Sequence, residues 1–160
     1  SSPATRLPGP YLVGADSRSI DDESIAAARW AKEILGADHR FAADRVNRLL
    51  LGSYGAQHVV FHGSDGVEQW QVLLSPQIGA VQIARLQLGE VEFVLIDRRL
   101  SWSLPLVPFY YEEGEIFEGR HTTPISAQVL AKWDRTAGVD RVYDSGHIQI
   151  YHVGGLYGTP

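Results

Sequence analysis

The sequence predicts a small three-layer α/β/α domain whose sheet is mostly parallel and ends in a C-terminal antiparallel hairpin. Helical and strand-like segments alternate along the chain, which is typical of strands joined by right-handed crossovers. Residues 91–97 contain four consecutive apolar residues, as expected of a strand that is covered on both faces. Near the end of the chain, alternating segments flank the turn Asp144-Ser145-Gly146, which indicates a hairpin.

The composition describes one folded domain. The chain has 160 residues, of which 44% are hydrophobic and 21% charged. The net charge of −5 argues against nucleic acid as a partner, and no apolar run is long enough to span a membrane. There is no cysteine for disulfides or thiolate metal sites. Because the chain has no Met and begins Ser1-Ser2-Pro3, we expect it to be a piece of a larger protein. We expect residues 1–18 to form a proline-containing linker, 19–153 the domain and 154–160 a flexible tail.

The elements of the first half follow from apolar spacing and capping residues. A helix over 21–35 begins near Asp21 or Asp22 and ends at Gly36. Its expected buried stripe, at helical spacing, is Ala27, Trp30, Ala31, Ile34 and Leu35. A strand over 40–44 precedes a helix over 46–54. A second strand over 58–61 precedes a turn at 62–66, which is rich in turn-forming residues.

The second half is predicted with one choice left open. Residues 70–74 fit either a strand or the approach to a helix, and 76–88 fit a helix despite Gly79. The strand over 91–97 is followed by a long irregular stretch, 101–123, that is rich in aromatic residues. Stretches of that length usually carry function or contact a partner. A helix over 124–136 precedes the hairpin strands, 141–143 and 148–153.

Polar residues follow three of the predicted strands. These groups are Asp44 to Asn47, His62 to Asp65, and Asp97 to Arg99. Parallel strands would bring all three groups to one edge of the sheet, where open α/β sheets bind ligands. The candidate site for a hydroxylated or anionic ligand comprises Asp44, Arg45, Asn47, Asp97, Arg98, Tyr110 and Tyr111. A simpler interpretation, which we favour, is that Asp44 and Asp97 cap helices or pair with neighbouring arginines.

Motifs for catalysis are absent from the sequence. No dinucleotide fingerprint or phosphate-binding loop follows a strand. Ser53 sits beside Gly52 and after a helix, unlike the serine of a nucleophile elbow. The six histidines show no metal-ligand spacing, and the glutamates between 112 and 118 are more typical of solvated surface than of a carboxylate pair. We therefore assign no catalytic residue, metal ligand or cofactor.

Three stretches of the chain carry a family resemblance. They are Ala26 to Gly36, Arg40 to Arg45 with Leu49 to Tyr54, and the closing Val139 to Tyr151. In the last, a tyrosine, an acidic residue and a glycine precede a strand ending in Ile-Tyr. Together they resemble the soluble extracytoplasmic C-terminal domains of polytopic bacterial membrane proteins, in particular membrane-embedded glycosyltransferases that use polyprenyl-phosphate sugars. The resemblance implies that the catalytic acids lie in the transmembrane part, so no catalytic residue transfers to this chain.

The leading functional hypothesis is therefore a non-catalytic accessory domain on the extracytoplasmic face of the bacterial membrane. Its partners would be the transmembrane part of its parent and carbohydrate of the cell envelope. Two other hypotheses stay open. One is a free-standing small enzyme or ligand-binding protein that uses the strand-end cleft. The other is a protein-interaction module that docks through the segment from Trp102 to Phe117.

Overall fold

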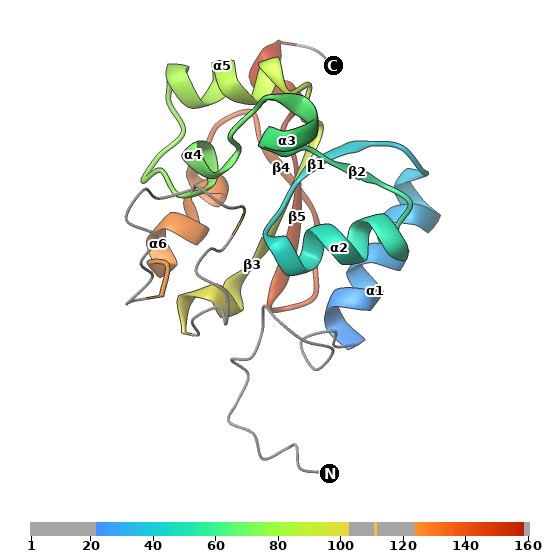
Figure 1. The fold of residues 1–160 in the computed structure, drawn as a ribbon. Helices are drawn as coiled ribbons and strands as arrows, with labels where there is room; N and C mark the ends of the chain where they lie inside the picture. The colour runs from blue at the N-terminus through green and yellow to red at the C-terminus, as the bar shows by residue number, and fades with distance from the viewer. Residues whose placement is uncertain (1–21, 103–110, 112–123, 159–160) are drawn as a thin grey trace.

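The computed structural model describes residues 22–102, 111 and 124–158, which form a five-stranded mixed sheet with helices on both faces (Figure 1). The strands are β1 (Arg40–Ala42), β2 (His58–Val59), β3 (Phe93–Asp97), β4 (Asp140–Asp144) and β5 (Ile148–His152). Their order across the sheet is β2-β1-β3-β5-β4. β1 is parallel to β2 and β3, whereas β5 is antiparallel to β3 and β4. The C-terminal hairpin is confirmed, but the sheet is parallel only in its β2-β1-β3 half.

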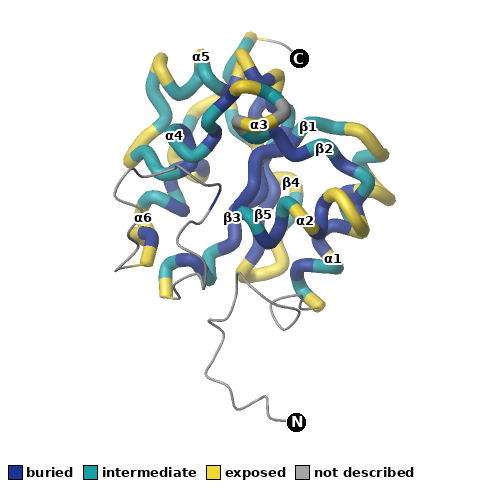
Figure 2. Tube along the Cα trace, in the orientation of Figure 1, coloured by how far each residue is buried: buried dark blue, intermediate teal, exposed yellow. Residues whose placement is uncertain are grey.

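The central strand β3 separates two hydrophobic cores. All five of its residues are buried, as the apolar run 91–97 predicts. Because side chains alternate along a strand, Phe93 and Leu95 pack into one core, and Val94 and Ile96 pack into the other. Figure 2 shows this buried centre, which continues into β5, whereas the edge strand β4 is largely exposed.

One face of the sheet is covered by α1 (Asp22–Trp30), the π-helical turn η3 (Ala31–Leu35) and α2 (Arg45–Ser53). Asp44 caps α2 by accepting a hydrogen bond from the Asn47 N–H at 3.0 Å. At Gly55, a Cβ atom would lie 2.8 Å from the Leu51 carbonyl oxygen and 2.9 Å from that of Ala28. The two helices therefore approach closely where the sequence places this glycine.

The expected buried stripe of the first helix is wrong at one residue. Ala27 and Ala31 are buried and Trp30 packs against Tyr143, but Ile34 is 64% exposed. The last five helical residues form a π turn, which has more residues per turn than an α-helix. This rotates Ile34 away from the face that spacing for an α-helix assigns to it.

The opposite face carries shorter elements. They are α3 (His62–Asp65), α4 (Trp70–Leu73), α5 (Ala80–Leu88), the 3₁₀ turn η4 (Arg98–Ser101), α6 (Ala127–Leu130) and the 3₁₀ turn η5 (Lys132–Arg135). Their apolar side chains, such as Leu73, Leu86 and Trp133, meet β3 in the second core. Residues 70–74, left open by the sequence, are thus mainly helical, and the expected turn at 62–66 contains one helical turn. The long helix expected over 124–136 is divided at Ala131 into α6 and η5.

The chain after β5 continues into the fold rather than fraying. Gly154–Tyr157 forms the 3₁₀ turn η6, and the Tyr157 hydroxyl donates a 2.9 Å hydrogen bond to the Val91 carbonyl oxygen. Gly155 lies against Gly138, where a Cβ atom would come within 2.5 Å of the Gly138 oxygen. Residues 154–157, at the start of the expected tail, therefore contact the rest of the fold.

Candidate functional site

Two of the three predicted strand ends meet at the carboxyl edge of the parallel strands. Asp44 follows β1 and Asp97 ends β3, and the Asn47 Nδ2 amide bridges them. It donates to Asp44 Oδ2 at 2.9 Å and to Asp97 Oδ2 at 3.1 Å. Asp44, Asn47 and Asp97 are only 4%, 1% and 6% exposed. The parallel alignment of β1 and β3 therefore correctly predicts that these side chains lie together.

Each of these acids also accepts hydrogen bonds from residues close to it in the sequence. Asp44 caps α2, as described above. Asp97 Oδ1 accepts from the Arg99 N–H at 3.1 Å and from Arg99 Nε at 2.8 Å, while Oδ2 accepts from Arg99 Nη2 at 2.8 Å. Arg99 Nη2 also donates to the Ser24 hydroxyl at the start of α1, at 3.0 Å. These capping and pairing contacts are the arrangement that the simpler interpretation describes.

Burial of two acids side by side has an electrostatic consequence. Burial, together with the nearby Asp97 carboxylate, raises the pKa of Asp44 to about 6. Arg99 opposes this shift but lies closer to Asp97. The amide nitrogen of Asn47 donates to both acids. Its Oδ1 atom receives no hydrogen bond from the described residues. The centre of the cluster is therefore polar and incompletely satisfied.

Arg98 lies apart from the two acids. Arg98 is the first residue of η4, and its side chain points to other partners than that of Asp97. Its guanidinium hydrogen-bonds Gln149, the Asp134 carboxylate at 2.9 Å and the Tyr151 hydroxyl at 2.9 Å. The prediction that Arg98 joins Asp97 in one cleft is therefore wrong.

The remaining candidates do not complete a cleft with the two acids. Arg45 is the first residue of α2 and is half-buried. Tyr111 is 1% exposed and belongs to the core that also contains Trp133. Its ring is thus not available on the surface. Tyr110 lies outside the described residues.

The third strand end turns back toward the other edge of the sheet. Asp65 accepts hydrogen bonds from Arg40 Nη2 and from the Phe61 N–H, and its carboxylate lies 2.9 Å from His58 Nε2. Arg40 and His58 are the first residues of β1 and β2. The short helix α3 therefore carries Asp65 away from Asp44, and the expectation that three polar groups converge is wrong for this one.

The exposed rim of the carboxyl edge consists of residues that the sequence did not bring together. Glu23, in the first turn of α1, accepts from the His147 N–H at 2.9 Å and contacts His147 Nδ1 at 2.8 Å. Ser145 also donates to Glu23. Burial acts to raise the pKa of Glu23, but these hydrogen bonds outweigh burial and hold it below its usual value. The Trp102 indole lies edge-on to the His147 ring, with centroids 5.6 Å apart, and is 54% exposed.

We call Glu23, Trp102 and His147 the rim triad. It adjoins the buried cluster, because the Arg98 N–H donates to the His147 carbonyl at 2.7 Å and Arg99 reaches Ser24. The sequence contained one local signal for it. The hairpin turn ends at His147, which places this side chain beside the last residues of β3.

Metal binding and membrane insertion find no support in the described parts of the chain. Residues 22–102, 111 and 124–158 contain no group of three or more His, Asp or Glu side chains arranged to hold a metal ion. No helix in the same residues is both long and apolar enough to cross a bilayer.

Ser53 donates its hydroxyl to the Leu49 carbonyl at 2.9 Å, as a helical serine commonly does.

Comparison with known proteins gives no family for this chain. No family model matches it, and no curated protein is significantly similar to it in sequence.

Proposed function

We propose that this chain is a non-catalytic extracytoplasmic accessory domain of a polytopic bacterial membrane protein that handles cell-envelope glycans. Its role there would be to bind carbohydrate at the rim triad. The membrane parent, the location and the glycosyltransferase link rest on the resemblance of three stretches of sequence. The carbohydrate role also rests on the chemistry of the rim.

The observation that carries the carbohydrate role is an exposed indole next to fixed polar groups. Sugars present apolar C–H faces that pack on aromatic rings and hydroxyls that bond to carboxylates and imidazoles. Trp102 supplies the ring, and Glu23 and His147 supply the polar groups, held in place by their mutual hydrogen bonds. A large aromatic side chain left half-exposed beside oriented polar groups is typical of a binding surface.

The non-catalytic part of the proposal is supported by the state of the two buried acids. A general acid or base must reach its substrate, yet Asp44 and Asp97 are almost fully buried and hydrogen-bonded by the chain itself. Their contacts fit a structural role beneath the rim.

Titration with neutral hexasaccharides of mannose, galactose and N-acetylglucosamine tests the carbohydrate role. We expect at least one of them to shift the Trp102 indole and His147 resonances, and we expect the His147 shift to be lost in Trp102→Ala. Tyr54→Ala is the matched control, because Tyr54 is also an exposed aromatic residue (38%) but follows the C-terminal end of α2. Unchanged spectra with all three sugars would refute the carbohydrate role at this rim.

The same spectra separate the other hypotheses. If the Trp102 indole resonance does not shift with sugars but does shift with a fragment of the membrane parent, the chain is an interaction module. Turnover of a small substrate that is lost in Asp44→Asn, in a variant that still folds, would instead make it an enzyme.

A further inference from the structure

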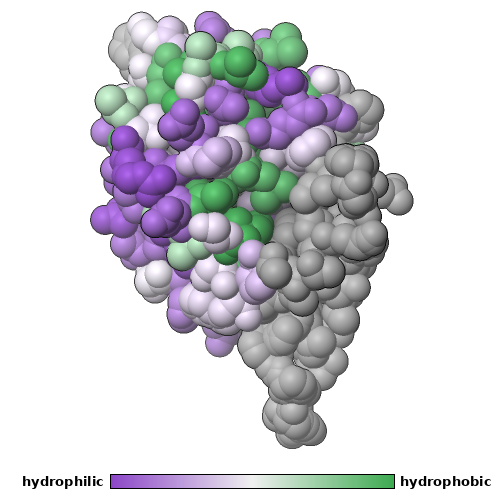
Figure 3. Space-filling view, turned by 90° about the vertical axis from the view of Figure 1, so that its left-hand side faces the viewer, coloured by the Kyte–Doolittle hydropathy of each residue, from purple (hydrophilic) through white to green (hydrophobic). Residues whose placement is uncertain are grey.

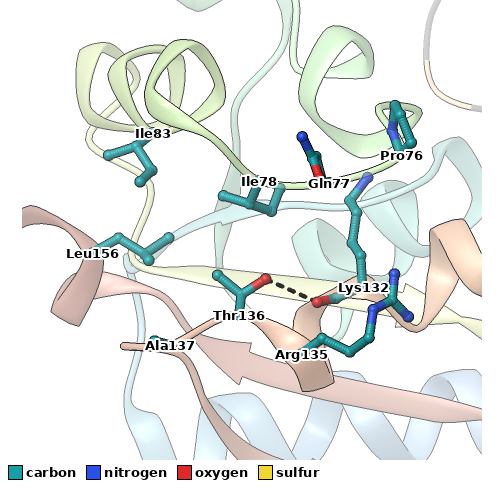
Figure 4. A pocket seen from close by; sticks show the side chains of 9 residues that line it. All are labelled: Pro76, Gln77, Ile78, Ile83, Lys132, Arg135, Thr136, Ala137 and Leu156. Atoms are coloured by element: carbon teal, nitrogen blue, oxygen red, sulfur yellow. Dashed lines mark hydrogen bonds between the residues drawn. The ribbon is translucent and has the colours of Figure 1, made fainter.

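A cavity of about 420 Å³ lies on the second-core side of the sheet (Figure 4). Its walls come from the segment before α5, from α5, from η5 and the residues after it, and from η6. The lining residues are Pro76, Gln77, Ile78, Ile83, Lys132, Arg135, Thr136, Ala137 and Leu156. η6 follows directly after β5, and the last residue of β5 pairs with Phe93 at the amino end of β3. Asp97 lies at the other end of β3, at the carboxyl edge. The cavity is therefore a separate site from the carboxyl edge.

The walls of the cavity are of two kinds. Ile78, Ile83 and Leu156 form an apolar side, and Figure 4 shows them spread along one part of the lining, while Arg135 and Thr136 come from the turn below. The space-filling view in Figure 3 shows apolar residues exposed near the top of the left-hand face, where α5 lies. Val81 and Leu88 of α5 are 60% and 74% exposed. The apolar wall is thus continuous with a helix that also shows apolar groups to solvent.

The other side of the cavity carries positive charge without a matching acid. The Lys132 side chain is 1% exposed, and its Nζ donates to the carbonyl oxygens of Val72, Leu73 and Ser75 at 2.6–2.7 Å. No carboxylate of the described residues pairs with Lys132 or with Arg135. A buried ammonium ordinarily has a carboxylate partner, whereas the described groups around this one are neutral: three carbonyls, the Ser75 hydroxyl and the Trp133 ring.

Arg135 provides donors that a ligand can reach. It is exposed, and its one hydrogen bond to the described residues is a 3.3 Å contact from Nη2 to the Gln128 carbonyl oxygen. A guanidinium carries five N–H donors in a planar fork that matches a carboxylate. The three hydrogens of Lys132 are already used, so Lys132 contributes attraction through charge rather than through a hydrogen bond.

We propose that this cavity binds a small organic carboxylate with an apolar tail. The carboxylate would pair with Arg135, within the field of Lys132, and the tail would lie against Ile78, Ile83 and Leu156. The volume is in the range of small-molecule sites. The anion would neutralise two cations that have no acid partner among the described residues.

Titration with octanoate, octanol and octylammonium, which share one tail and differ in charge, tests this site. We expect octanoate to shift the resonances of Ile83, Leu156 and Arg135 with at least tenfold higher affinity than octanol, and octylammonium not to bind. Equal affinity for octanoate and octanol would overturn the proposal, because the two cations would then have no role.

Two charge variants locate the carboxylate. Arg135→Gln should lower octanoate affinity toward that of octanol, whereas Arg85→Gln should leave it unchanged. Arg85 is on α5 but does not line the cavity, so both variants lose one positive charge and only one loses the proposed contact. Equal losses in the two variants would mean that octanoate responds to overall charge alone, which would also refute the site.

Proton uptake gives a readout that does not require a variant. Burial, with a smaller effect of Arg135, lowers the pKa of Lys132 to about 7. The groups around its Nζ are the carbonyls near the end of α4, Ser75 and the Trp133 ring, while the neighbouring Asp134 pairs with Arg98. A bound carboxylate would raise the pKa of Lys132 again.

Calorimetry at pH 7.5 in two buffers of different ionisation enthalpy should therefore detect proton uptake with octanoate and none with octanol. Octanoate binding without proton uptake would exclude Lys132 from the site.

Discussion

Asp44 offers a direct test of the electrostatics beneath the rim. Its carboxylate is 4% exposed, and its pKa is raised from 3.8 to about 6 by burial and by Asp97. Between these two values the folded chain holds a proton that the unfolded chain has released. Asp44 therefore makes the folded state less stable as pH rises from about 4 to 6. At ~1.4 kcal/mol per pKa unit, the shift corresponds to a loss of ~3 kcal/mol.

The variant Asp44→Asn removes the titrating group with little change of size. Its side-chain oxygen can still accept the hydrogen bond from the Asn47 N–H, so the cap of α2 is kept. We expect the free energy of unfolding of the wild type, relative to the variant, to fall by up to ~3 kcal/mol between pH 4 and pH 7. Above pH 7 the difference should be constant.

Urea unfolding followed by tryptophan fluorescence, at unit steps from pH 4 to pH 8, measures this difference. Asp140→Asn is the control, because Asp140 is exposed on the edge strand β4. A wild-type-to-variant difference that stays constant from pH 4 to pH 7 would refute the reasoning. A difference that grows in favour of the wild type would show instead that the Asp44 carboxylate is ionised and stabilising in the folded state.

Two further predictions concern stability elsewhere in the fold. The pKa of Lys132 is lowered from 10.5 to about 7, so the unfolded chain binds a proton that the folded chain lacks. The unfolding free energy should therefore rise between pH 7 and pH 10, by at most ~5 kcal/mol, and urea titrations of Lys132→Met should lack this rise. In thermal melts Gly155→Ala should lose ~2 kcal/mol or more, because its Cβ would meet the Gly138 oxygen at 2.5 Å. Gly52→Ala should gain ~0.5–1 kcal/mol, since that helical position is open; equal effects of the two glycine changes would contradict this packing.

The parts of the fold that sequence predicts are those governed by local rules. β3 was recognisable because both of its faces are buried, and α2 because Asp44 caps it and Gly55 follows it. The π turn at Ala31–Leu35 was not recognisable, since nothing in the apolar spacing distinguishes it from an α-helix. The antiparallel C-terminal strands were recognisable from the hairpin turn at Asp144-Ser145-Gly146. No pattern within the strands indicated that β5, and not β4, pairs with β3.

The candidate site shows the same division. Asp44 and Asp97 could be placed together because parallel neighbours end at one edge. Asp65 could not be placed, because β2 has only two residues and one helical turn then redirects the chain. The pairing of Glu23 with His147 joins residues 124 positions apart, which no spacing rule reaches. Sequence reasoning thus found the buried floor of the site but not its exposed rim.

The buried floor and the rim are linked through Asp97, and this link gives a final prediction. Asp97 holds Arg99 by three hydrogen bonds and caps η4, the turn that leads directly to Trp102. Asp44 contacts the floor but not η4. We therefore expect Asp97→Asn to weaken the arginine pairing and to change the chemical shifts of the Trp102 indole and His147 in the protein without ligand.

Asp44→Asn should leave the same resonances nearly unchanged, and the two variants are matched, because both acids are buried and contact Asn47. If both shift Trp102 equally, the rim responds to general loosening of the edge. If only Asp97→Asn does, the buried arginine pair positions the surface that we propose binds carbohydrate. That positioning role would explain why a buried acid lies under the rim that we propose binds carbohydrate.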